Sequence, residues 1–88
     1  MSDFKTKSEF KTKSKEFNVK LGEYLKAQRN EQRYTMRALA NKLDTPHSFI
    51  GKIEQQSRRL DVGEFVQYCK ALNIDPTKAI REIEKQMG

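Results

Sequence analysis

Apolar residues recur at helical spacing along most of the chain, and no segment alternates apolar and polar positions as a half-buried strand does. Five segments carry an apolar stripe at intervals of three and four residues. They are residues 18–33, 36–43, 46–55, 62–72 and 76–88. The pattern predicts an all-α fold, a compact bundle of about five helices.

Capping residues mark the starts of these segments. Thr35 precedes the second segment as an N-cap, and Asp61-Val-Gly-Glu64 approaches the capping-box pattern at the start of the fourth. Asp75-Pro76 opens the last segment in the same way. Before the third segment, we expect Thr45 to be the cap and Pro46 to be the first helical residue, because proline is favoured there.

The fourth segment is expected to bury its whole apolar stripe. The stripe consists of Val62, Phe65, Val66, Cys69 and Leu72. Cys69 is therefore interpreted as a small core residue and not as a reactive thiol.

Composition limits the classes of function. With 88 residues, 35% of them hydrophobic, the chain has room for one modest core. No apolar run reaches the roughly 18–20 residues of a membrane span. One cysteine and one histidine exclude an internal disulfide and make a zinc site implausible, and no catalytic constellation is visible. We expect a cytoplasmic protein that is no enzyme and needs no cofactor.

The positive charge is unevenly distributed. Residues 29–59 carry seven basic and three acidic side chains, whereas residues 60–88 carry four basic and five acidic ones. The net charge of +6 is thus a feature of the first two-thirds of the chain. This asymmetry suits a protein with one face for a polyanion and another for a different contact.

The second and third segments form the most informative pattern, two short helices joined by a tight turn. Leu39, Ala40 and Leu43 of the first can pack on Ile50 and Ile53 of the second. A small residue such as Ala40 lets the helices cross closely. The outer face of the second helix is then polar or small, and it fits a DNA major groove about 12 Å wide.

Four stretches carry a family resemblance. They are Thr35-Met-Arg-Ala-Leu-Ala-Asn-Lys-Leu43, His47-Ser-Phe-Ile-Gly-Lys-Ile-Glu54, Arg58-Arg-Leu-Asp-Val62 and Ala71-Leu-Asn-Ile-Asp-Pro76. They resemble the Cro/phage-repressor, or XRE, type of helix-turn-helix over residues 19–80. The resemblance implies a lambda-repressor-like DNA-binding domain whose recognition helix spans Pro46–Gln55.

The same resemblance assigns roles to individual positions. Base contacts are expected from His47, Ser48 and Lys52, and from Phe49 unless it packs inside the protein. Phosphate contacts are expected from Met36, Arg37, Gln55, Gln56, Ser57, Arg58 and Arg59. Arg29 and Glu54 occupy the positions of a structural salt bridge.

Three positions depart from the family pattern. Met36 replaces the usual glutamine and removes a side-chain bond to phosphate, although its backbone N–H remains. Pro46 replaces the usual serine before the recognition helix, and Asp44 replaces the usual glycine of the turn. Asp44 is expected in the left-handed conformation, with a charge unfavourable to a nearby phosphate unless it points away.

The resemblance also implies a homodimer, with the fifth helix and the loop before it as the interface. The interface residues expected are Tyr68, Ile80, Ile83 and Met87. The Ile80, Ile83 and Met87 stripe can equally be core. A dimer would bind a roughly palindromic double-stranded operator, most often as a repressor and in some cases of its own gene.

Other roles for this fold stay open at this stage. They include an antitoxin with a toxin as protein partner, a restriction–modification controller, a phage or mobile-element regulator, and a protein-interaction module that has lost DNA binding. We expect no membrane partner, because the phenylalanines of the basic N-terminal segment are too sparse for strong insertion.

Residues 1–17, which hold two copies of a Phe-Lys-Thr-Lys-Ser motif, are treated as a separate basic segment before the domain of residues 18–88. Three interpretations are open. The segment is a disordered tail, a helical extension that packs through Phe10, Phe17 and Tyr24, or a basic arm that follows the DNA backbone.

Overall fold

The computed structural model describes residues 6–87, which form five helices and, within that range, no strand. The helices are α1 (Lys7–Glu31), α2 (Met36–Leu43), α3 (His47–Glu54), α4 (Val62–Ala71) and α5 (Pro76–Gln86). The all-α prediction is confirmed. None of the described helices has the length and apolarity that crossing a membrane requires.

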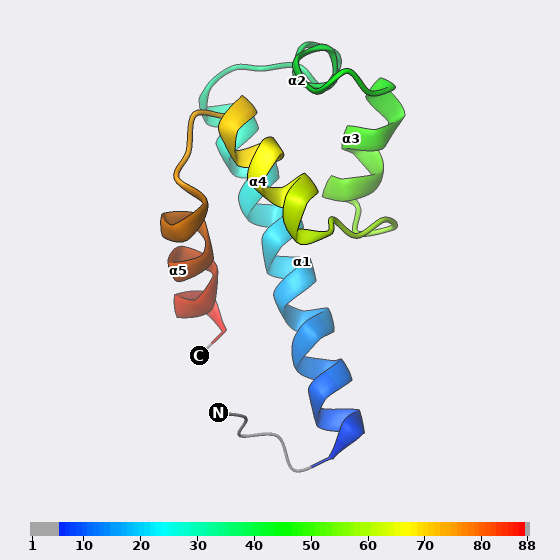
Figure 1. Cartoon of the computed structure of the whole chain (residues 1–88), viewed down its shortest axis with the longest axis vertical. Helices are drawn as coiled ribbons and strands as arrows, with labels where there is room; N and C mark the ends of the chain where they lie inside the picture. Colours follow the sequence, from blue (N-terminus) through cyan, green and yellow to red (C-terminus); the bar gives the residue numbers. More distant parts are fainter. Residues whose placement is uncertain (1–5, 88) are drawn as a thin grey trace.

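Helix α1 forms the long axis of the molecule, and the other four helices gather around its C-terminal part (Figure 1). At 1.5 Å per residue its 25 residues span about 38 Å, close to the 42 Å longest dimension of the part of the chain that the structure describes. The helix packs against α3 and α5, while α4 packs against α2 and α5. Its N-terminal turns therefore project beyond the bundle.

The first helix begins well before Asn18, the expected start. Thr6 caps it by accepting a hydrogen bond from the amide of Glu9, and residues 7–17 continue without a break into the domain. The expected boundary after residue 17 thus lies inside α1, and residues 1–5 of the basic segment lie outside the described residues. Phe17 and Tyr24 pack against the core, whereas Phe10 is 54% exposed.

The core is built from one apolar stripe of each helix. Its fully buried members are Leu25, Leu39, Ile50, Cys69, Leu72, Ala79 and Ile83, with Tyr68 and Ala40 at 1% exposure. Burial raises the pKa of the Cys69 thiol to about 11, so the group is protonated at neutral pH. The interpretation of Cys69 as a core residue is confirmed.

Two apolar positions of α4 are not buried as expected: Val66 is only half-buried, and Val62 is exposed. Val62 is 80% exposed, although it lies one turn before buried Phe65. It is the first residue of the helix, after the Asp61 cap, and the core ends before it. The capping box itself is present, with Asp61 and Glu64 each bonded to the other's backbone amide.

The tight turn between α2 and α3 differs from the prediction at one end. Thr35 caps α2 and Asp44 takes the left-handed conformation, as expected. Pro46, however, is the N-cap of α3 in an extended conformation, and the helix starts at His47. Thr45 is therefore not the cap, and its hydroxyl is buried with no hydrogen-bond partner among the described residues.

Candidate nucleic-acid interface

Helices α2 and α3 pack face to face through small and branched apolar side chains. Leu39 and Ala40 of α2 and Ile50 and Ile53 of α3 are at most 3% exposed. This contact, together with the turn at Asp44, fixes how α3 lies on the protein. One side of α3 is therefore committed to the core and the other is left for solvent.

The outer face of α3 presents three of the four side chains predicted to contact bases. His47, Ser48 and Lys52 are exposed. Phe49 instead packs against the core, and the Arg58 guanidinium lies over its ring, 4.7 Å from the centroid. Of the two roles considered for Phe49, the structure favours packing, because an internal cation–π contact already occupies its ring.

The start of α2 offers backbone donors beside α3. Thr35 accepts a hydrogen bond from the amide of Ala38, which leaves the amides of Met36 and Arg37 at the helix N-terminus. Arg37 is exposed. Met36 is half-buried, and its sulfur is the atom nearest to where a Cβ on Gly51 would lie, at 3.8 Å. The Met36 side chain is thus a spacer between α2 and α3.

The residues after α3 fold back on it. The amides of Gln55 and Ser57 donate to the carbonyls of Gly51 and Lys52, and Gln56 is left-handed with φ 59°. The Gln56 carboxamide donates to the Glu54 carbonyl at 2.6 Å. Gln55 and Ser57 have exposed side chains, but this segment uses its amides internally and does not offer a row of free N–H groups.

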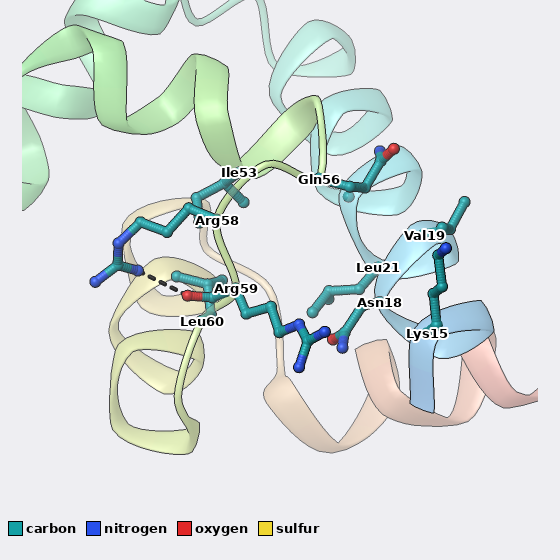
Figure 2. A pocket seen from close by; sticks show the side chains of 10 residues that line it. Lys15, Asn18, Val19, Leu21, Ile53, Gln56, Arg58, Arg59 and Leu60 are labelled. Carbon is teal, nitrogen blue, oxygen red and sulfur yellow. Dashed lines mark hydrogen bonds between the residues drawn. The ribbon is translucent and has the colours of Figure 1, made fainter. Parts of the chain in front are cut away.

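The adjacent arginines Arg58 and Arg59 point in opposite directions (Figure 2). Arg58 forms a bidentate pair with Glu64 of α4, at 2.9 and 3.1 Å, and also donates to the Arg59 carbonyl. This pair lowers the pKa of the Glu64 carboxyl. Arg59 extends the other way, toward Asn18 of α1.

Arg29 and Glu54 form a buried ion pair that joins α1 to the end of α3, with a shortest N–O distance of 2.6 Å. The contact holds α3 in place, and both side chains are buried. Its partners are 7% and 6% exposed. Both residues are therefore part of the framework and not of the interface.

The expected dimer residues divide into two groups. Tyr68 and Ile83 are 1% and 0% exposed, so both belong to the core and offer no surface to a second chain, which corrects that assignment. Ile80 is 36% exposed and Met87 is half-buried. The apolar stripe of α5 thus serves mainly the interior, and its edge reaches the surface.

One cleft beside the interface was not predicted from the sequence. It lies between α1 and the segment that follows α3, and is lined by Lys15, Asn18, Gln56, Arg58 and Arg59 among others (Figure 2). The spacing of Lys7, Lys11 and Lys15 was the available signal. Among residues 6–87, no cluster of three metal-ligating side chains occurs.

Comparisons with known proteins agree with this geometry. A helix-turn-helix family model matches residues 25–78, more than half of the chain. The XRE-family like protein from Pseudomonas syringae pv. tomato str. DC3000 is 28% identical, with a TM-score of 0.78 over 92% of this chain and 98% of its own.

The restriction-modification controller protein C.AhdI from Aeromonas hydrophila has a similar fold. It is 24% identical, with a TM-score of 0.65 over 69% of this chain and 92% of its own. None of the curated proteins matches the chain. The chain belongs to the XRE-type helix-turn-helix family of DNA-binding regulators.

Proposed function

We propose that this protein is a cytoplasmic transcriptional repressor that binds a palindromic DNA operator as a homodimer. The observation that carries the proposal is the exposed polar face of α3, with His47, Ser48 and Lys52 held outward by a fully packed inner face. Lys52 can donate to the O6 and N7 atoms of guanine, and His47 can donate or accept.

Phosphate contacts on both sides of α3 would set its position in the groove. On one side are the amides of Met36 and Arg37 and the Arg37 side chain; on the other are the side chains of Gln55 and Ser57. We assign Arg58 a smaller part in phosphate binding, because its guanidinium is already paired with Glu64 and stacked on Phe49.

The second protomer would cover the exposed apolar residues at the start of α4 and in the middle of α5. Val62 and Ile80 line one shallow hollow of about 170 Å³ together with half-buried Phe17 and Leu60. Burial of such side chains favours association. The two α3 helices of the dimer would then contact half-sites that lie about one turn of the DNA helix, or roughly 34 Å, apart.

A footprint on the DNA upstream of the gene tests this function. The wild-type protein should protect two symmetric half-sites. Lys52→Ala should lower the affinity for that site by about 1–3 kcal/mol. Lys70→Ala, which removes an exposed charge from α4, is the matched control and should leave protection unchanged. Equal protection by all three proteins would contradict the assignment of α3 as the recognition helix.

A further inference from the structure

The cleft between α1 and the segment after α3 has a positively charged lining. Its volume is about 110 Å³. Lys15, Asn18 and Gly22 of α1 form one wall, and Gln56 and Arg59 belong to the other (Figure 2). The lining contains no carboxylate; its remaining residues are Val19, Leu21, Ile53, Arg58 and Leu60.

Two cations that line the cleft, Lys15 and Arg59, have no carboxylate partner among the described residues. Arg58 is paired with Glu64, whereas neither Lys15 nor Arg59 forms an ion pair with any residue in the range 6–87. Both are exposed. Two like charges on the facing walls of a cleft create a local positive potential, and an anion between them would interact favourably with both.

In the N-terminal turns of α1, a row of lysines lies on one face of the helix and the carboxylates lie on the opposite face. Lys7, Lys11 and Lys15 are spaced by four residues and share one face of the helix. That row of lysines leads directly to the cleft. Glu9, Lys13 and Glu16 lie on the opposite face. The described part of the basic segment therefore has one cationic face without carboxylates.

The cleft is held in a fixed geometry. A Cβ at Gly22 would lie 2.7 Å from the Gln56 Nε2 atom and 3.0 Å from the Ile53 carbonyl oxygen, so a larger residue would have to displace the Gln56 side chain and press on the backbone at the end of α3. Leu21 and Leu25 anchor the same part of α1 in the core. The lysine row is thus rigidly connected to the recognition helix.

We propose that Lys15 and Arg59 form a second DNA-phosphate site, and that the lysine row on α1 extends the contact along the backbone of the same duplex. This inference rests on the proposed function, since it assigns a further part of the same DNA complex. The cleft lining includes Ile53 in the last turn of α3 and Gln56, two residues after the helix ends, so a phosphate there would flank the half-site that α3 contacts.

The test measures how DNA affinity depends on salt. Each phosphate neutralised contributes about 0.9 to the slope of log K against log salt concentration. Wild-type protein, Lys15→Gln, Arg59→Gln and the double variant are titrated into a labelled random-sequence duplex of about 30 base pairs, three helical turns. Lys13→Gln is the matched control, because it removes the same charge from the opposite face of the same helix turns.

We expect Lys15→Gln and Arg59→Gln each to reduce the slope by about 0.9 per protomer, the double variant by about twice that, and Lys13→Gln by much less. Circular dichroism and sedimentation confirm that each variant keeps its fold and oligomeric state. Equal slopes for Lys15→Gln and Lys13→Gln, whether changed or unchanged, would overturn the site. If the wild-type protein itself fails to bind any duplex, the proposed function fails instead.

Discussion

Arg29 of α1 and Glu54, the last residue of α3, are joined by two hydrogen bonds in a buried, bidentate ion pair. The Nε atom of Arg29 donates to Oε2 of Glu54 at 2.6 Å, and Nη2 donates to Oε1 at 3.0 Å. The remaining nitrogen, Nη1, donates to the Tyr34 carbonyl at 2.7 Å. The hydrogen bond to Glu54 raises the pKa of Arg29, so the arginine stays charged throughout the accessible pH range.

Removing one partner of this pair should be costly. Arg29→Met leaves the Glu54 carboxylate buried and unpaired, and we expect a loss of about 3–5 kcal/mol in the free energy of unfolding. Arg29→Met/Glu54→Leu removes both charges and should lose clearly less. Urea denaturation measures both values. A double variant less stable than the single one would contradict this account.

Two helical glycines should respond in opposite directions to alanine. Gly22→Ala drives a methyl group against the Ile53 carbonyl and the Gln56 side chain, so it should destabilise the protein despite alanine's higher helix propensity. Gly51→Ala meets nothing closer than the Met36 sulfur at 3.8 Å and should stabilise α3 by up to about 1 kcal/mol. Thermal unfolding compares the two; a stabilised Gly22→Ala would refute the close contact.

The Arg58–Glu64 pair makes the start of α4 sensitive to acid. Because the bond from Arg58 lowers the Glu64 pKa in the folded protein, the pair stabilises the fold above the carboxyl's ordinary pKa. That contribution is lost as the pH falls through the lowered value. In Arg58→Gln, the Glu64 pKa should rise, as followed by NMR titration of the side-chain carboxyl.

The capping bond to the Asp61 amide remains in that variant, so the Glu64 pKa should not rise to the value of an unbonded carboxyl. Asp61→Asn, which keeps a capping oxygen and leaves the Arg58 pair intact, serves as the control. An unchanged Glu64 titration in Arg58→Gln would show that the pair does not form in solution.

Substitutions at two isoleucines of α5, Ile80 and Ile83, should distinguish an effect on dimerisation from an effect on folding. Ile80→Glu places a charge at a side chain that is 36% exposed, so we expect a folded protein that no longer dimerises. Ile83→Glu buries an unpaired charge at a fully buried site and should unfold the domain. Sedimentation and circular dichroism distinguish the two. If the Ile80→Glu variant remained dimeric, the proposed dimer interface at Ile80 would be wrong.

Local signals in the chain were enough to predict the five helices from residue 18 onward, most of their caps and the helix-turn-helix pair, but not the part of α1 over residues 7–17. Apolar residues at spacings of three and four define a buried stripe wherever they occur. Thr35, Asp61 and Asp75 cap helices through bonds to amides two or three residues away. The left-handed turn at Asp44 is equally local. Such features depend on residues close together in sequence.

The exposure of a side chain depended on distant elements. Val62 fits the apolar stripe of α4 but lies where the core has ended, while Tyr68 and Ile83 are enclosed by the other helices. Likewise, Arg58 and Arg59 are adjacent in sequence, yet Glu64 holds one of them and the other extends toward α1.

The sequence alone thus determined the helical segments from residue 18 onward and which face of α3 is polar, because both follow from local periodicity, whereas the extension of α1 over residues 7–17 was not determined. Tertiary structure decided which charges are free to meet DNA. The cleft between Lys15 and Arg59 joins positions 44 residues apart, and Gly22 allows the close approach of α1 to Ile53 and Gln56 at its base. The spacing of residues along one helix could reveal the row of lysines in α1. It could not reveal that Arg59 lies opposite Lys15, the last lysine of that row.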